Sequence, residues 1–443
     1  MGGAIFAALW VLLSRCTSTG LLADTDTNVL LQTIRAKNAP FSWFLSDWPL
    51  YNHFYRPIPT LTFEIDTRLY GDQASGYAWT NAILAAGCVL ALFWFLREFL
   101  DKPLLAAGGT LLFASWQAAS LEPDWIYLVY FAWLTLAVGA IRHGKSWKSY
   151  VPAFLITLYL AHELDPIKPL EGRVIDWLPG RTASCLTLFA LIAMAAYARY
   201  ERLGRSQLVE PITPLTPPAT RSSSIDKAPG TRWPWAVLAL ISTALGFACY
   251  EQAVMLPACL LGVAVYYKWL GRHPSWTLNV AFWGLLGGYL LLRHEVIPPG
   301  VSQYQHQQLR TTAGALNSLY DFEWPFSTWE GTWLMFQQGW FVFFSATLYI
   351  ACLSWASGIE AVWQMRRQWH ICVAGWGLSV LAFLPMAWLK VFEHYYYWPL
   401  ALRTVFVMGV VTIAWKLIST AWCPPEQQAP TRLSPAPGSL PHP

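Results

Sequence analysis

The sequence predicts an all-α integral membrane protein with about twelve transmembrane helices and a large first outside loop. Three observations support this class. Of the 443 residues, 55% are hydrophobic and only 12% are charged, whereas a soluble domain carries about 25% charged residues. The mean hydropathy is +0.36, and apolar runs near the length of about 20 residues that crosses a bilayer recur along the chain. The 27 Trp and 20 Tyr residues suit a protein with two membrane–water boundaries.

The candidate spans follow these apolar runs. They are residues 3–22, 78–97, 103–120, 124–141, 149–163, 182–199, 233–250, 254–268, 275–293, 335–356, 371–389 and 399–420. The run 149–163 is short, so a re-entrant segment is its alternative. Arg15 interrupts the first run, where a cleaved signal peptide is the alternative. The cationic start and small-residue cleavage site of a signal peptide are missing, which favours an uncleaved helix.

Lys and Arg gather in alternate junctions, which the positive-inside rule assigns to the cytoplasm. These basic junctions are 97–102, 142–148, 199–232, 268–272 and 366–367. The opposite side then receives most of the acids, in segments 23–77, 120–123, 162–181, around 251, 294–334 and 390–398. We therefore expect cytoplasmic N- and C-termini and a multi-pass protein of the bacterial inner membrane.

One polytopic domain is expected to occupy residues 1–420. Its outside loop 23–77 should carry short amphipathic helices, and a second outside loop should cover 294–334. A Pro- and Ser-rich composition predicts a cytoplasmic linker at 200–232 and a disordered cytoplasmic tail at 421–443.

Charge and cysteine usage exclude two classes of function. The formal net charge of +4 is small and spread along the chain, so there is no nucleic-acid footprint. The eight Cys residues lie in or beside apolar runs, without CxxC or Cys/His spacing. They are expected to be small buried hydrophobes rather than metal ligands.

The candidate chemistry begins with Asp24 and Asp26, directly after the first span. Two carboxylates at this spacing can share a divalent cation such as Mg²⁺ or Mn²⁺, or divide into a base and its supporting group. Helix N-capping is the alternative reading of the same pair.

Further candidates lie in the other outside segments. Arg56, beside Tyr55, can bind a phosphate through its planar fork, with snorkelling to headgroups as the alternative. Glu163 and Arg181 can contact a phosphate or a sugar, or simply flank a Pro-Gly turn. Glu251 lies between two apolar runs, so it should face a cavity or a partner, unless it snorkels from a tight turn.

The last outside segment carries Glu393 and His394 at the start of an aromatic run. These two side chains make a rim that contacts sugar or phosphate plausible. An interfacial aromatic belt is the alternative.

Taken together, these segments resemble the multi-spanning glycosyltransferases of the GT-C class, and within it the protein O-mannosyltransferase-like members. The resemblance rests on the order and shared outside placement of five stretches, none of them specific alone. They are Asp24/Asp26, Tyr55-Arg56-Pro57 with Leu69-Tyr70-Gly71 and Thr80-Asn81, Trp177 to Thr182, Tyr250 to Ala253, and Phe392 to Pro399. This chain departs in the spacing of its acids, in Leu121-Glu122-Pro123-Asp124, and in Ala183 after Thr182. No tetratricopeptide array follows the last span.

The resemblance implies an inverting transfer of a sugar from a polyprenyl-phosphate donor to a lipid, glycan or protein acceptor on the outer face. Asp24 would be the base, supported by Asp26 or sharing a cation with it. Arg56 and Arg181 would hold the donor phosphate, while Glu251, Glu393 and His394 would line the cavity. The sugar, the acceptor and the metal requirement stay open.

Two rival functions stay open at this stage. An O-antigen-type polymerase or ligase would use Arg293, His294, His306 and Arg310 in the late outside loop. A polytopic transporter would place its key charges near the membrane midplane, and would show paired broken helices that this chain lacks.

Overall fold

The computed structural model describes residues 1–18, 20–118, 174–204, 231–323, 365–390 and 392–422. Within these ranges the regular secondary structure is helical, and the one β-bridge is an isolated pair between Leu309 and Leu389. The prediction of an all-α protein is therefore confirmed.

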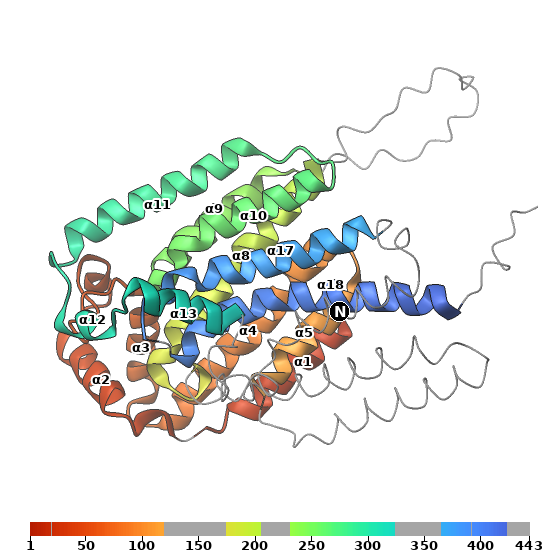
Figure 1. Cartoon of the computed structure of the whole chain (residues 1–443). Coiled ribbons are helices and arrows are strands. Elements are labelled where there is room, and N and C mark those ends of the chain that lie inside the picture. Colours follow the sequence, from red (N-terminus) through yellow and green to blue (C-terminus); the bar gives the residue numbers. More distant parts are fainter. Residues whose placement is uncertain (19, 119–173, 205–230, 324–364, 391, 423–443) are drawn as a thin grey trace, which may run out of the picture.

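The bundle consists of the longer, more apolar helices. They are α1 (Gly2–Arg15), α4 (Ala74–Leu100), α5 (Pro103–Ser115), α8 (Arg181–Leu203), α9 (Trp233–Phe247), α10 (Leu256–Trp269), α11 (Trp276–Val296), α17 (Arg366–Phe383) and α18 (Tyr397–Trp422). Helix α4 packs against α1, α5 and α8, and α17 packs along α18, whereas α11 flanks the bundle beside α9 and α10 (Figure 1).

Four helical segments in the described ranges are long and apolar enough to cross a membrane: Ala74–Leu100, Leu178–Leu203, Arg366–Met386 and His394–Ile413. They indicate a multi-pass membrane protein. Helices α1, α5 and α9 are shorter apolar helices, and α10 and α11 occupy the expected positions. The predicted spans 124–141, 149–163 and 335–356 lie outside the described residues, so the number twelve stays a prediction.

The first predicted span is shorter than expected, because α1 ends at Arg15 rather than at residue 22. The Arg15 side chain is buried, donates from Nε to the Gln117 backbone oxygen at 2.6 Å, and pairs with Asp176 at 2.9 Å. The residue that interrupts the apolar run is thus satisfied inside the protein. Helix α5 likewise ends at Ser115, short of the predicted residue 120.

The loop 23–77 contains short helices, as predicted, while its outside location stays a prediction. They are α2 (Thr25–Lys37), the 3₁₀ turn η2 (Pro40–Leu45) and α3 (Pro57–Tyr70). Helix α2 buries Leu30, Leu31 and Ile34 in a small apolar cluster with Trp48 and Phe63, separate from the bundle core. Helices α2 and α3 lie at one end of the bundle with α12 (Gln303–Gln308), and α13 (Thr312–Glu323) follows α12 (Figure 1).

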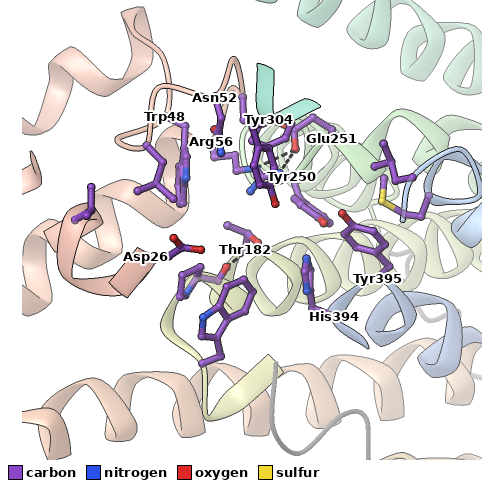
Figure 2. A pocket seen from close by; sticks show the side chains of 17 residues that line it. Asp26, Trp48, Asn52, Arg56, Thr182, Tyr250, Glu251, Tyr304, His394 and Tyr395 are labelled. Atoms are coloured by element: carbon purple, nitrogen blue, oxygen red, sulfur yellow. Dashed lines mark hydrogen bonds and ion pairs between the residues drawn. The ribbon is translucent and has the colours of Figure 1, made fainter. Parts of the chain in front are cut away.

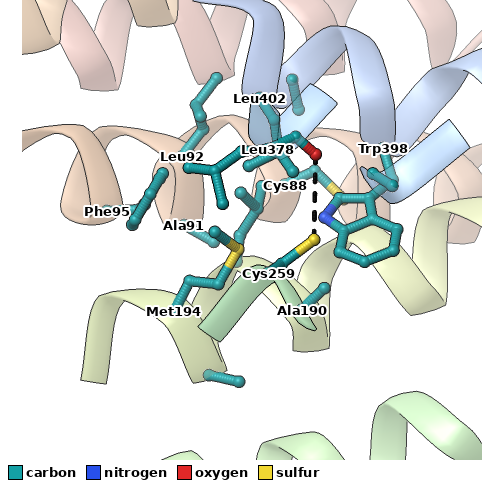
Figure 3. Packing of buried hydrophobic residues seen from close by; sticks show 14 of the residues in the cluster. Cys88, Ala91, Leu92, Phe95, Ala190, Met194, Cys259, Leu378, Trp398 and Leu402 are labelled. Atoms are coloured by element: carbon teal, nitrogen blue, oxygen red, sulfur yellow. Dashed lines mark hydrogen bonds between the residues drawn. The ribbon is translucent and has the colours of Figure 1, made fainter. Parts of the chain in front are cut away.

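The bundle core is apolar and closely packed, with Cys88, Leu92, Cys259, Leu378 and Trp398 among its members (Figure 3). All six cysteines in the described ranges are buried with free thiols. This agrees with their expected role as small hydrophobes.

The predicted linker 200–232 begins later than expected, whereas its predicted end agrees with the start of α9 at Trp233. Helix α8 continues to Leu203, and the Arg232 guanidinium lies 4.4 Å from the Tyr200 ring centre just before α9. The rest of the linker, residues 205–230, and the tail from 423 lie outside the described residues.

Candidate functional site

A cavity of about 330 Å³ lies at the end of the bundle where the predicted outside segments meet. Figure 2 shows the polar and aromatic side chains that project into it. They include Asp26, Trp48, Asn52, Arg56, Thr182, Tyr250, Glu251, Tyr304, His394 and Tyr395. Five sequence regions that charge patterning assigned to one side of the membrane therefore contribute to its lining.

Arg56 and Glu251 form the charged centre of this cavity. Pro57 starts α3, a position where its fixed φ is tolerated, so Arg56 lies on the extended segment before the helix. The Glu251 carboxylate accepts from Arg56 Nε at 2.9 Å and Nη2 at 2.6 Å, and from the Tyr55 backbone N–H at 3.2 Å. Glu251 is thus partnered across 195 residues rather than snorkelling from its turn.

Aromatic rings surround the Arg56 guanidinium. Its carbon lies 4.1 Å from the Phe54 ring centre, 4.5 Å from Tyr250 and 5.4 Å from Trp48. Glu251 accepts from Nε and from one N–H of Nη2, which leaves Nη1 and the second N–H of Nη2 as donors toward a ligand. Tyr55 itself does not line the cavity; its hydroxyl donates to the Phe44 backbone oxygen at 3.2 Å.

The two acids after the first helix occupy different environments. Asp24 is the N-cap of α2, accepting from the Thr27 backbone N–H at 3.3 Å and from Trp177 Nε1 at 3.0 Å. Asp26, in the first helical turn, lines the cavity. Burial and, secondly, the Asp24 charge raise the pKa of Asp26. The capping alternative therefore applies to Asp24, and the geometry favours Asp26 as the chemically available carboxylate.

Arg181 is not part of the cavity, contrary to the expectation that it holds the donor phosphate. Its side chain is 0% exposed and pairs with Asp66 at 2.6 Å. It also donates to Asn81 Oδ1 at 2.6 Å and to Thr62 Oγ1 at 3.2 Å. Arg181 is turned inward because a guanidinium at the start of a buried helix needs internal partners. Helices α3 and α4 supply these partners.

His394 lies in the cavity wall among aromatic rings. Its ring centre is 5.3 Å from Trp177, 6.1 Å from Tyr250 and 4.5 Å from Tyr395. Glu393 begins the 3₁₀ turn η9 (Glu393–Tyr396), but its side chain is outside the described part of the chain. Glu163 also lies outside the described residues.

Several lining residues were not among the predicted site residues. One loop contributes Trp48, Asn52 and Phe54. Asp47 fixes the backbone of this loop, because its carboxylate accepts hydrogen bonds from the N–H groups of Trp48, His53 and Phe54. Asp47 followed by Pro49 and Asn52 is a turn composition that could have indicated such a loop.

Tyr304 also lines the cavity, from α12 in the loop predicted over 294–334. Ser302 and Gln305 form a capping box that starts this helix, a signal readable in the sequence. Ser302 Oγ donates to the Asn52 backbone oxygen at 3.0 Å, and Gln305 Nε2 to the His53 oxygen at 3.1 Å. Burial raises the pKa of Tyr304; Arg56 lowers and Asp26 raises it, as expected if the three face one another.

The residues that the rival ligase chemistry would use do not line this cavity. Arg293 Nη2 donates to the His53 backbone oxygen at 3.3 Å, and Arg310 Nη1 to Ser318 at 2.5 Å. His294 and His306 are exposed at the surface.

A shared divalent cation at Asp24 and Asp26 was one of the alternatives for this pair. Within the described ranges, no group of three or more His, Cys, Asp and Glu side chains could hold a metal ion. Two carboxylates alone suit only a cation that takes its remaining ligands from water and a phosphate, as Mg²⁺ commonly does.

Fold and site together describe a multi-spanning helical protein with one polar, aromatic cavity at an end of its bundle. Comparison with protein-family models, with curated proteins and with solved structures found no match.

Proposed function

We propose that this protein is a membrane glycosyltransferase. It transfers a sugar from a polyprenyl-phosphate donor to a lipid, glycan or protein acceptor on the outer face of the membrane. The observation that carries the proposal is the cavity itself. It combines an accessible carboxylate, a guanidinium with a free donor edge, and walls of Trp, Tyr and His rings at one end of an apolar bundle.

The reaction is a single displacement. The acceptor oxygen attacks the anomeric carbon while the bond from that carbon to the phosphate oxygen breaks, which inverts the configuration. Asp26 takes the proton of the acceptor, and its raised pKa suits a base better than an ordinary aspartate. The phosphate leaves with the bonding electrons, and Arg56 stabilises its negative charge.

Glu251 has a positioning role in this scheme. By accepting from Nε and Nη2 of Arg56 at 2.9 and 2.6 Å, it fixes the plane of the guanidinium between the Phe54 and Tyr250 rings. Nη1 is then held toward the phosphate before the donor arrives. Such preorganisation lowers the cost of binding.

A divalent cation remains part of the proposal in a limited form. Asp26, with Asp24 behind it, could hold Mg²⁺ or Mn²⁺ only together with phosphate oxygens of the donor and water. A cation bound there supplies positive charge to the leaving group.

Two observations favour this function over its rivals. Arg293 and Arg310, which a ligase-type reaction would use, make protein contacts outside the cavity. The charged pair Arg56–Glu251 joins the residue before α3 to the turn between α9 and α10, at the ends of these helices, whereas a transporter would concentrate its charges near the midplane.

The test supplies membranes containing the protein with labelled polyprenyl-phosphate sugars and identifies the glycosylated product by mass. Asp26→Asn should reduce turnover by about 10²-fold or more with donor binding kept. Asp72→Asn is the matched control, because this carboxylate belongs to the same outside loop but is 88% exposed and paired only with Arg35. Arg56→Lys should instead weaken donor binding, because an ammonium cannot reproduce the planar fork.

Absence of any product with every donor would overturn the proposal. Transfer that survives Asp26→Asn but is abolished by Arg310→Gln would favour the ligase-type reaction. Movement of the lipid across the membrane without a product would favour a transporter.

A further inference from the structure

A second cavity, of about 280 Å³, lies between α4, α5, α17 and α18. Leu100, Leu105 and Ile371 form its apolar lining, and Gln368 and Thr412 also line it. Lys102 and Arg367 bring two positive charges to it. The proposed transfer reaction does not use this cavity.

This cavity lies at the opposite end of the bundle from the candidate site. Met386, at the end of the spanning segment Arg366–Met386, lines the site cavity, and Arg367 lines the second one. Nineteen helical residues at 1.5 Å each separate them by about 28 Å, close to the thickness of the hydrocarbon. Lys102 lies two residues after Leu100, the last residue of the long apolar helix α4. The two cations therefore lie where a bilayer passes from acyl chains to headgroups.

The positive charge at this cavity is not neutralised locally. The neighbouring acids are paired elsewhere, since Glu98 contacts Arg199 and Arg202, at 3.4 and 2.9 Å, and Asp101 contacts Arg202 at 3.1 Å. Among the described residues, neither Lys102 nor Arg367 forms a salt bridge.

Helix ends of both signs meet at this cavity. Helix α5 starts at Pro103 and α17 at Arg366, so the positive ends of two helix dipoles are directed to this region, whereas α4 ends at Leu100 and directs its negative end there. The first-turn N–H groups of such helices suit an anionic oxygen.

We propose that this cavity binds the phosphate-bearing headgroup of an anionic phospholipid from the membrane leaflet opposite the candidate site. Lys102 and Arg367 contact the phosphate, and the acyl chains leave along the apolar surface of Leu105 and Ile371. Basic pockets between transmembrane helices are suited to anionic headgroups.

The experiment uses the purified full chain in neutral detergent with three ligands: phosphatidylglycerol, phosphatidylcholine with the same acyl chains, and soluble glycerol 3-phosphate. Bound lipid per protein is measured by native mass spectrometry, and the unfolding temperature is followed in parallel. We expect about one phosphatidylglycerol to bind in preference to phosphatidylcholine, with no comparable binding of glycerol 3-phosphate.

The double variant Lys102→Gln/Arg367→Gln should weaken phosphatidylglycerol binding by about tenfold or more. The matched control is Arg97→Gln/Arg366→Gln, which removes two exposed charges from the same helix ends without altering the cavity lining, and should change binding less than about threefold. Leu105→Trp fills the cavity with both charges kept, and should also weaken binding.

Equal losses in the two double variants would show diffuse surface attraction and overturn the site. Glycerol 3-phosphate binding as tightly as the lipid would also overturn it, in favour of a soluble phosphate ester. Binding that persists in Leu105→Trp would mean that the lipid lies outside the cavity. Sugar transfer by the membranes is measured separately, so the failure of one proposal does not decide the other.

Discussion

At the scale of single residues, two aspartates two positions apart have different tasks. Asp24 is the N-cap of α2, and its carboxylate is turned back to the backbone N–H of Thr27 and to Trp177. Asp26 lies two residues further, in the first turn of α2, and its side chain points to the cavity (Figure 2). The same residue type is thus structural at one position and available for chemistry at the other.

This difference leads to a prediction for pH dependence. A base works only when deprotonated, so activity should fall as pH drops through the pKa of Asp26, which lies above its ordinary value of 3.8. Asp24→Asn removes the second cause of that shift and should lower this pKa. The acidic limb of kcat/KM against pH should therefore move to lower pH, with burial still keeping it above the ordinary position.

Fold should be retained in Asp24→Asn, because Asn caps helices about as well as Asp. Turnover at neutral pH should change by less than about tenfold, against about 10²-fold or more for Asp26→Asn. Loss of turnover in Asp24→Asn equal to that in Asp26→Asn, with an unmoved acidic limb, would return the role of base to Asp24.

At the scale of elements, buried ion pairs and close helix contacts hold the segments that line the candidate site against the bundle. Arg181 begins α8 and joins it to α3 through Asp66 and to α4 through Asn81. The turn just before it, η4 (Leu178–Gly180), supplies Pro179 to the cavity wall. Arg181 thus supports the site from behind without touching it.

Arg181→Leu should destabilise the protein strongly, because Asp66 would keep a buried charge without a partner. Breaking such a pair costs about 3–5 kcal/mol. The measurement is the unfolding temperature in detergent, and Asp66→Asn added to Arg181→Leu should recover part of the loss. Burial already raises the pKa of Asp66 despite the opposing charge of Arg181. An unchanged unfolding temperature with weakened donor binding would instead place Arg181 at the donor phosphate.

The close contact between helices α17 and α18 leads to a second prediction at this scale. A Cβ atom at Gly375 would collide with the backbone of Phe406 on α18, so the two helices depend on this glycine for close approach. Gly375→Ala should lower the unfolding temperature, since overpacking typically costs about 1–3 kcal/mol. Gly377→Ala is the matched control two residues away, where a Cβ meets nothing within 4 Å. Equal unfolding temperatures for the two variants would contradict the close contact.

At the scale of the whole molecule, all segments that form the candidate site lie at one end of the bundle, although they come from residues 26 to 395. The charge pattern of the loops had assigned these same segments to one side of a membrane. The agreement concerns which segments share a side, and that this side faces outward stays a prediction.

A labelling experiment tests that orientation. In a background without native cysteines, Gln73→Cys should react with an impermeant thiol reagent in intact cells, because Gln73 is exposed at the start of α4. His273→Cys is the matched control at an exposed position between α10 and α11, and should react only after permeabilisation. The reverse pattern would invert the topology.

Local signals in the sequence determined much of this architecture. Apolar runs located α4, α8, α9, α10, α11, α17 and α18 to within a few residues, since burying or embedding such runs is obligatory. The predicted end of the first span was wrong. Arg15 pairs with Asp176 from a distant part of the chain, and α1 ends at Arg15 rather than at residue 22. The short helices expected in loop 23–77 are present as α2 and α3.

The sequence by itself also identified Asp26, Arg56, Glu251 and His394 as candidate site residues. Polar and charged side chains next to apolar spans cost free energy unless they have a partner or line a cavity. Only the tertiary structure decided their pairing. Arg56 and Arg181 are equivalent in the sequence, yet one meets Glu251 in the cavity and the other meets Asp66 inside the protein. Which charge neutralises which depends on contacts across more than a hundred residues, and local patterns carry no information on such distances.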